Sequence, residues 1–331
     1  MRAIWIALAV GSVAATAALA VYGGGSATAA PQGTTVNLVA YSTPKEAYGK
    51  IISAFDKTAA GKDASFTQSY SGSTEQAAAI VGGLPADVVA LSLEPDVATL
   101  VNHRIVAKTW KKGKYHGMVT DSIVVFVVRD GNPKKIHGWA DLIKSGIEVI
   151  TPNPVTSGGA RWNIMAAYGA VRKQGKTHKQ AVSYLQKLFK HVPVMAASAR
   201  EALSTFASGK GDVLLTYENE AIFANKKGTR TDYVRPRETI LIENPVALTK
   251  SGAKKKQAKA FVNFLRTPAA QRIYADNGYR PVVKKVLKQF SFPHPKGLFT
   301  IGYVGGWPKA QRQFFNPKSG IVTKIIANLG K

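Results

Sequence analysis

In the first third of the chain, stretches of continuous or alternating hydrophobic residues are followed by stretches in which hydrophobic residues recur every three or four positions. TVNLVAYS, SFTQSYS and ADVVALS (residues 35–42, 65–71 and 86–92) are extended apolar or alternating stretches, which predicts β-strands. In KEAYGKIISAFDKTA and STEQAAAIVGG (residues 45–59 and 73–83), apolar residues recur every three or four positions, which predicts helices. Strands that alternate with helices indicate βαβ units around a mainly parallel sheet.

A second alternating series lies between two long apolar segments, DSIVVFVVRDGNP and ETILIENPVALTK (residues 121–133 and 238–250). IEVITP, VPVM and DVLLTY are its predicted strands, and the helices KKKQAKAFVNFLRT and PAAQRIYADNGY follow it. We therefore predict an α/β fold of two lobes joined by two extended crossings, with a ligand in the cleft between them. Residues 34–120 form lobe 1 and residues 121–239 form lobe 2, while residues 240–331 return to lobe 1 with the C-terminal helices.

The N-terminus resembles an export signal. Arg2 precedes an apolar run from Ala3 to Val21, and small residues follow as far as Ala29. We predict that residues 1–29 are a signal peptide and that the protein acts in the periplasm or at the outer face of the cytoplasmic membrane. An uncleaved membrane anchor is the alternative, because the run approaches the ~20 residues that span a bilayer.

Charge is the least ordinary feature of the composition. The chain has 45 Lys and Arg against 19 Asp and Glu, a net charge of +26. Such a surface attracts nucleic acid, anionic polymers and small anions. The basic residues are scattered in twos and threes, and no nucleic-acid motif accompanies them, so we expect a solvated basic surface and no nucleic-acid partner. The chain has no cysteine, which excludes disulfides and thiol chemistry.

Small polar residues or glycine stand at several predicted strand-to-helix junctions, at residues 42–44, 71–73, 157–159 and 197–199. Any one of them is an ordinary helix cap. Together, however, they place unpaired backbone N–H groups and the positive ends of helix dipoles at one side of the sheet. The pattern predicts a socket for a tetrahedral dianion.

No set of catalytic or metal-ligating residues appears. Ser157 does not lie in a G-x-S-x-G elbow, and the six histidines lack the H-E-x-x-H spacing. Glu218 and Glu220 are two positions apart, so they would not face the same way on a helix. We therefore expect a binding protein, with no enzymatic activity, no metal and no cofactor.

Several motifs resemble one known family. These are VITPNPVTSGGARWN, PADVVALS, VRDGNPKKIHGWADLIK, GDVLLTYENEA, GYRP and LFTIGYVGGWPKAQ, which occur in the family's order over residues 34–320. They are similar to the sulfate receptors of bacterial sulfate and thiosulfate ABC importers. The resemblance implies the type II periplasmic-binding-protein fold, which agrees with the two lobes predicted above, and a dehydrated sulfate held between the lobes by hydrogen bonds.

The resemblance also implies a set of binding residues. Ser157 would donate its hydroxyl, and Gly158 and Gly159 would donate backbone N–H groups at the start of a helix. Ser73 and Ala199 would donate N–H groups from two other helix starts. Further donors would be the N–H of Ser42 and the side chain of Tyr217. The resemblance favours a role for Arg161 in holding the binding loops, and a direct salt bridge from Arg161 to the anion is the alternative.

Two of these positions depart from the family pattern. Ser42 and Thr43 stand where the family has aspartate before proline, and Tyr217 stands where the family's tryptophan donates its indole N–H. A phenol also donates a hydrogen bond, over a different reach. Because serine and tyrosine serve as donors in the related molybdate receptors, a receptor for molybdate or tungstate is one alternative. A basic surface protein that binds polyanions is another.

A socket of donors without an acceptor suits a fully ionised anion. Hydrogen phosphate carries a proton, and burying that donor unpaired costs about 1 to 3 kcal/mol. The expected partners are therefore sulfate or a related tetrahedral oxyanion and an ABC transporter permease. We expect a monomer that captures the anion, closes and delivers it.

Overall fold

Two groups of parallel strands are joined by a pair of long antiparallel strands in the computed structural model, which describes residues 33–330. In the first group, β1 (Thr34–Tyr41) lies between β2 (Ala64–Ser71) and β3 (Val88–Ala90) and is parallel to both. Three helices connect and follow these strands: α1 (Lys45–Phe55), α2 (Ser73–Val81) and α3 (Glu94–Asn102). The carboxyl ends of the three strands therefore meet at one edge of the sheet.

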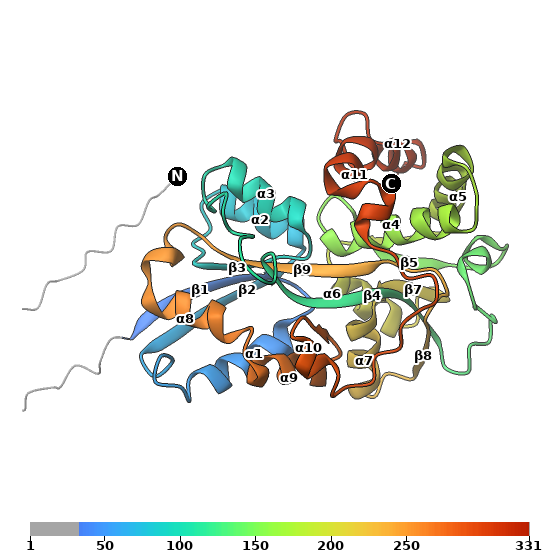
Figure 1. The fold of residues 1–331 in the computed structure, drawn as a ribbon. Helices are drawn as coiled ribbons and strands as arrows, with labels where there is room; N and C mark the ends of the chain where they lie inside the picture. Colours follow the sequence, from blue (N-terminus) through green and yellow to red (C-terminus); the bar gives the residue numbers. More distant parts are fainter. Residues whose placement is uncertain (1–32, 331) are drawn as a thin grey trace, which may run out of the picture. The chain divides into compact units, whose positions relative to one another are not determined.

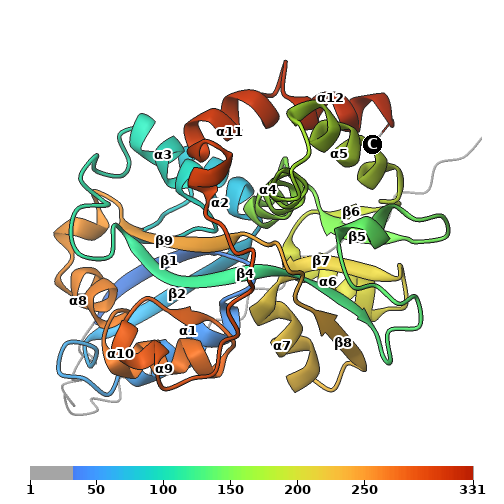
Figure 2. The ribbon, with the colours of Figure 1, turned by 45° about the vertical axis from the view of Figure 1, so that its right-hand side comes forward.

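The central pair consists of β4 (Met118–Arg129) and β9 (Leu241–Leu248), which run side by side through the molecule (Figures 1 and 2). β9 is antiparallel to both β3 and β4, so it ties the first group of strands to the central pair. Residues 123–128 of β4 are at most 1% exposed, which explains their unbroken apolar sequence. β4 and β9 lie within the two long apolar segments of the sequence, residues 121–133 and 238–250, apart from the first residues of β4.

The second parallel group is β7 (Val213–Tyr217), β5 (Val149–Pro152) and β6 (Met195–Ala196), and β7 pairs antiparallel with β4. The segments around these strands form α4 (Gly158–Lys173), α5 (His178–Lys190), α6 (Ala199–Ala207) and α7 (Glu218–Lys226). A short strand, β8 (Thr231–Val234), pairs with β4 beyond α7. Helices α4 and α6 are the first helices after the strands β5 and β6, respectively.

The C-terminal segment contacts both groups. Helices α8 (Lys256–Phe264) and α9 (Pro268–Asp276) pack against β9 and α1, and they lead to β10 (Arg280–Pro281) and α10 (Lys284–Leu287). Helix α11 (Gly306–Phe314) packs against α3, and α12 (Ile321–Asn328) packs against α5. Trp307 of α11 also meets Trp162 of α4 edge to face, with ring centroids 4.6 Å apart. The division of the chain into lobes at residues 120 and 239 stays a prediction.

The structure confirms the α/β class and most of the predicted elements. The hydrophobic pattern predicts no element at α3, β8, β10, α10, α11 and α12, which the structure adds. The predicted signal peptide, residues 1–29, lies outside the described residues. Within residues 33–330, no helix combines the length and the apolar character needed to cross a bilayer, and no cluster of His, Asp and Glu is suited to a metal ion.

Candidate anion-binding site

Helix α4 begins at the serine and the two glycines of the TSGG motif. Ser157 is the N-cap, and its Oγ accepts a hydrogen bond of 3.4 Å from the amide of Ala160. Gly158 and Gly159 are the first two residues of the helix, and both are buried. A side chain at Gly158 would place its Cβ 1.9 Å from Cδ2 of Leu93, so the close approach of α4 to the residues after β3 requires glycine at this position.

The first residues of α2 and α6 lie next to this helix start. A Cβ on Gly159 would be 3.6 Å from Cβ of Ala199, the first residue of α6. Ser73, the first residue of α2, accepts a 2.8 Å hydrogen bond from the amide of Ser92, and Ser92 lies 3.0 Å from the Cβ position of Gly158. The three helix N-termini predicted to hold the anion therefore converge.

Direct contacts between loops fix these three helix starts. The amides of Thr74 and Glu75 donate to the carbonyl of Thr156, at 3.0 and 3.1 Å. The hydroxyl of Thr156 in turn donates to the carbonyl of Ala197 at 2.7 Å. A Cβ on Gly72 would lie only 2.4 Å from the Thr156 carbonyl oxygen, so this contact also depends on a glycine. The loops before α2, α4 and α6 thus form one connected unit.

The amides at the three helix starts divide into two sets. The amides of the first set have an acceptor within the protein. The amides of Ala160 and Glu201 donate to the hydroxyl oxygens of the serines that cap their helices. The amide of Arg200 donates to Oγ of Ser42 at 3.4 Å. In contrast, no hydrogen-bond acceptor among residues 33–330 lies at the amides of Ser73, Gly158, Gly159 and Ala199. Each of these four residues is buried. Buried amides without an acceptor are rare in proteins, so a cluster of them indicates a ligand.

Tyr217 closes the site from the end of β7. Its ring lies 3.6 Å from the Cβ position of Gly159, and its hydroxyl is 2.6 Å from Oγ of Ser92. Burial raises the pKa of the Tyr217 phenol well above its ordinary value, and the nearby Tyr41 raises it further. The phenol is therefore neutral and keeps a proton that it can donate.

Ser92 connects more of the site than the sequence reading indicated. Besides its contacts with Ser73 and Tyr217, its carbonyl accepts hydrogen bonds from Nε1 of Trp162 at 2.9 Å and from Nδ2 of Asn244 at 3.0 Å. It follows β3 and precedes α3, so it stands at a strand-to-helix junction like the four that were singled out. Because the hydrophobic pattern does not predict α3, it does not indicate this junction.

Arg161 lies behind the site rather than in it. Its Nε donates to the carbonyl of Pro154 at 2.8 Å, and its Nη1 is 3.9 Å from Asp96. Asp96 in turn accepts from the hydroxyls of Ser73 and Thr74. Burial lowers the pKa of Arg161, and the charge of Asp96 opposes that shift. In the described part of the chain, Arg161 thus contacts the loop before α4, Asp96 of α3 and, through Nη1, Gln311 of α11 at 3.5 Å, and its role in holding the binding loops stays a prediction.

Arg200 was not among the predicted residues, although it directly follows Ala199. Its guanidinium group binds Glu46 of α1 at 2.7 Å and Glu220 of α7 at 2.9 Å, and it also donates to the carbonyl of Thr43 at 2.9 Å. Glu220 is fully buried, and burial raises its pKa although Arg200 lowers it. Arg200 therefore joins helix α6 to α1 of the first group of strands.

Known proteins resemble this chain over most of its length. The sequence model of the family described as "Bacterial extracellular solute-binding protein" matches residues 36–280. A sulfate-binding protein of Synechococcus elongatus is 42% identical over 85% of this chain and 83% of its own length. A thiosulfate-binding protein of Pseudomonas aeruginosa is 34% identical over 84% of this chain and 88% of its own. The structure of the sulfate-binding protein SubI from Mycobacterium tuberculosis H37Rv is 40% identical, covers 86% of this chain and 100% of its own, and has a TM-score of 0.83.

Proposed function

Because the chain belongs to the bacterial extracellular solute-binding protein family, we propose that it is a receptor that captures sulfate or thiosulfate and delivers it to an ABC transporter permease. The proposal rests on the cluster of amides at the buried residues Ser73, Gly158, Gly159 and Ala199, which have no acceptor within residues 33–330. They point from three helix N-termini, whose dipoles favour a negative charge. Binding and release of the anion require no covalent chemistry.

The donors around this cluster suit a fully ionised anion. The Ser157 hydroxyl and the Tyr217 phenol can each donate one hydrogen bond. Asp96 is the carboxylate behind the site, and the hydroxyls of Ser73 and Thr74 already bind it. Hydrogen phosphate would find no ready acceptor for its proton, at a cost of about 1 to 3 kcal/mol, which corresponds to roughly one or two orders of magnitude in affinity.

Capture proceeds by closure of two lobes, residues 34–120 with 240–331, and residues 121–239. Ser73 and Ser92 belong to the first and Gly158, Ala199 and Tyr217 to the second, so an anion bound to either recruits donors from the other. Hinge bending at β4 and β9, the two connections between the strand groups, would open and close the site. The closed form is what the permease recognises.

The proposal includes an exported, monomeric protein. Its predicted signal at residues 1–29 places it in the periplasm or at the outer face of the cytoplasmic membrane, where an extracellular solute-binding protein meets its permease. Neither a cofactor nor nucleic acid is needed for this role. The positive surface of the protein raises the local concentration of small anions around it.

Thermal unfolding of ligand-free protein tests the proposal, with sulfate, thiosulfate, molybdate, tungstate and phosphate added at matched ionic strength. An anion at a thousand times its dissociation constant stabilises by about 4 kcal/mol, which is a shift of several degrees. We expect sulfate or thiosulfate to produce this shift and phosphate to produce none. A shift with molybdate or tungstate alone would identify the alternative receptor, and no shift with any of the anions would contradict the receptor function.

A pair of cap variants makes the test specific. Ser157 of α4 and Thr267 of α9 each accept a 3.4 Å hydrogen bond from the third amide of their helix. Ser157→Ala and Thr267→Ala both remove a cap, at about 1 kcal/mol each. Only Ser157→Ala should also reduce the shift that sulfate produces. Equal sulfate shifts in the two variants would place the anion elsewhere.

A further inference from the structure

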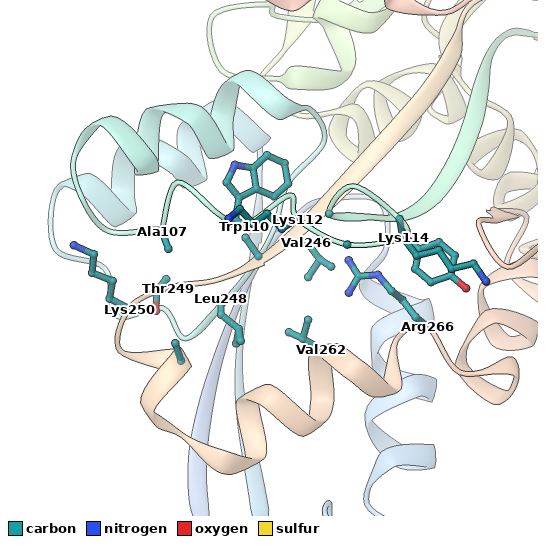
Figure 3. A pocket seen from close by; sticks show the side chains of 15 residues that line it. Ala107, Trp110, Lys112, Lys114, Val246, Leu248, Thr249, Lys250, Val262 and Arg266 are labelled. Atoms are coloured by element: carbon teal, nitrogen blue, oxygen red, sulfur yellow. The ribbon is translucent and has the colours of Figure 1, made fainter.

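A second cavity lies well away from the converging helix starts. It has a volume of about 420 Å³ and is lined by β9 and the residues that follow it, by Val262 of α8 and Arg266, and by the segment between α3 and β4. Figure 3 shows Val246 of β9 and Val262 of α8 on opposite sides of the cavity, with the guanidinium group of Arg266 beside them. None of the predicted anion-binding residues lines it.

The walls of this cavity are apolar, but every charged residue in its lining is a cation. Val246, Leu248 and Val262 form part of the wall, together with Trp110. The charged residues of the lining are Lys112, Lys114, Lys250 and Arg266. An apolar space of a few hundred Å³ bordered by a few polar groups has the character of a small-molecule site.

Arg266 is the cation that most needs a partner. Its Nε donates to the carbonyl of Met118 at 3.0 Å, while none of the ion pairs within residues 33–330 includes it. The Tyr115 ring lies 6.0 Å from the guanidinium carbon. Arg266 is partly exposed, and burial of the rest of its side chain lowers the pKa of its guanidinium group. An anion that enters the cavity can therefore reach and pair with it.

We propose that this cavity is a second ligand site, which binds an organic acid with a compact apolar body. The guanidinium group of Arg266 would pair with the carboxylate of the ligand, since its planar N–H groups match a carboxylate in a two-point hydrogen bond. The apolar body would contact Val246, Leu248 and Val262. The surrounding lysines add attraction for an anion, and the lining offers no carboxylate to repel it.

Isothermal titration calorimetry with 4-phenylbutyrate tests this site, and its neutral amide, 4-phenylbutyramide, is the matched probe. We expect saturable binding of one carboxylate per chain and binding of the amide at least tenfold weaker. Failure to bind 4-phenylbutyrate, or equal binding of acid and amide, would overturn the proposal. Because sulfate does not enter this measurement, the result is independent of the proposed receptor function.

Variants distinguish a specific carboxylate site from nonspecific attraction of the anion to the basic surface. Arg266→Gln should weaken carboxylate binding at least tenfold, whereas Arg312→Gln, which removes an exposed arginine from α11, should change it less than twofold. Leu248→Trp should abolish binding of both probes by filling the cavity. Equal losses in the two arginine variants would overturn the proposal. Since Arg266 also binds a backbone carbonyl, circular dichroism checks folding, and Arg266→Lys, which keeps the charge, should retain more binding than Arg266→Gln.

Discussion

The hydroxyl groups of Tyr217 and Ser92 lie 2.6 Å apart and connect the end of β7 to the second residue after β3. The two strands belong to different parallel groups, on opposite sides of the central pair β4 and β9. This hydrogen bond therefore bridges the two sides of the candidate site. Each hydroxyl has one proton, so when Ser92 donates to Tyr217, the phenol proton is available to the anion.

Tyr217→Phe tests this relationship. The variant removes the phenol and leaves the buried Ser92 hydroxyl without this partner, which should lower the free energy of unfolding by about 1 to 2 kcal/mol. It should also weaken sulfate binding by roughly tenfold, since one donor to the anion is lost. Tyr184→Phe is the control, because that hydroxyl donates to the Trp139 carbonyl and lies outside the predicted site. Unchanged sulfate affinity in Tyr217→Phe would exclude Tyr217 as a donor.

The two glycines of α4 should respond differently to a methyl group. In Gly158→Ala, the new Cβ would overlap Leu93 at 1.9 Å and crowd Cβ of Ser92 at 3.0 Å, so we expect a loss of about 1 to 3 kcal/mol in the free energy of unfolding. In Gly159→Ala, the nearest atom is Oγ of Ser157 at 3.3 Å, followed by atoms of Ala199 and Tyr217 at 3.6 Å.

Gly159→Ala should therefore fold with nearly unchanged stability and lose sulfate affinity, because its methyl group enters the space that the donors surround. Chemical denaturation and calorimetric titration of both variants separate the two effects. A Gly159→Ala protein that binds sulfate as tightly as the parent would show that the anion does not lie in front of this amide.

Much of this candidate site could be predicted from sequence, because its proposed donors are mainly backbone amides at helix starts. Strand-to-helix junctions are visible as a change of hydrophobic period followed by small residues, and this located Ser73, Gly158 and Ala199. The resemblance to a known family then supplied Tyr217. That these residues come together in space could not be read from the periodicity, since it depends on the order β3, β9, β4, β7 and β5 in the sheet.

Contacts between side chains that are distant in sequence were beyond prediction. Arg200 meets Glu46 across 154 positions, and Ser92 meets Tyr217 across 125, and no local pattern encodes either pair. Glu218 and Glu220 are not expected to act together, and this stays a prediction. They are nevertheless both fully buried, because Arg280 and Arg235 pair with the first and Arg200 with the second.

Arg200→Met tests the link between α6, α1 and α7. The substitution leaves the buried carboxylate of Glu220 without its cation, so we expect a loss of about 3 to 5 kcal/mol in the free energy of unfolding. In the double variant Arg200→Met and Glu220→Gln, position 220 has no buried carboxylate that lacks a cation. A substantial part of the lost free energy of unfolding should therefore be recovered. Urea denaturation of the single and double variants measures the coupling. Strictly additive losses would mean that the two residues do not depend on each other.

Asp121 should make stability depend on pH at the point where the central strands meet. It lies directly opposite Glu243 in the pairing of β4 with β9. Arg280 is its neighbour on the other side, but that guanidinium group binds Glu218 at 2.8 Å. Burial, reinforced by the negative charge of Glu243, raises the pKa of Asp121 from 3.8 to about 7, although Arg280 opposes the shift.

The direction of the effect follows from the protons that each state binds. Between about pH 4 and pH 7, the folded protein keeps a proton on Asp121 that the unfolded chain has released, so the free energy of unfolding falls as the pH rises through this window. Asp121→Asn does not titrate, and its carboxamide removes the repulsion with Glu243. The variant should be more stable than the parent at pH 8, by on the order of 2 kcal/mol, and the difference should shrink towards pH 4.

Urea denaturation at half-unit steps from pH 4.5 to pH 8.5 measures this slope, with Asp130→Asn as the control because Asp130 is exposed. Glu94 and His116 also act on Glu243, so Glu243→Gln provides a second arm, and it should flatten the same part of the profile by lowering the pKa of Asp121. Parallel pH profiles of Asp121→Asn and the parent would show that Asp121 is ionised in the folded protein throughout this range. If the folded protein instead keeps a proton on Asp121 below pH 7, ionisation of Asp121 above pH 7 would weaken the pairing of β4 with β9, where the proposed hinge lies.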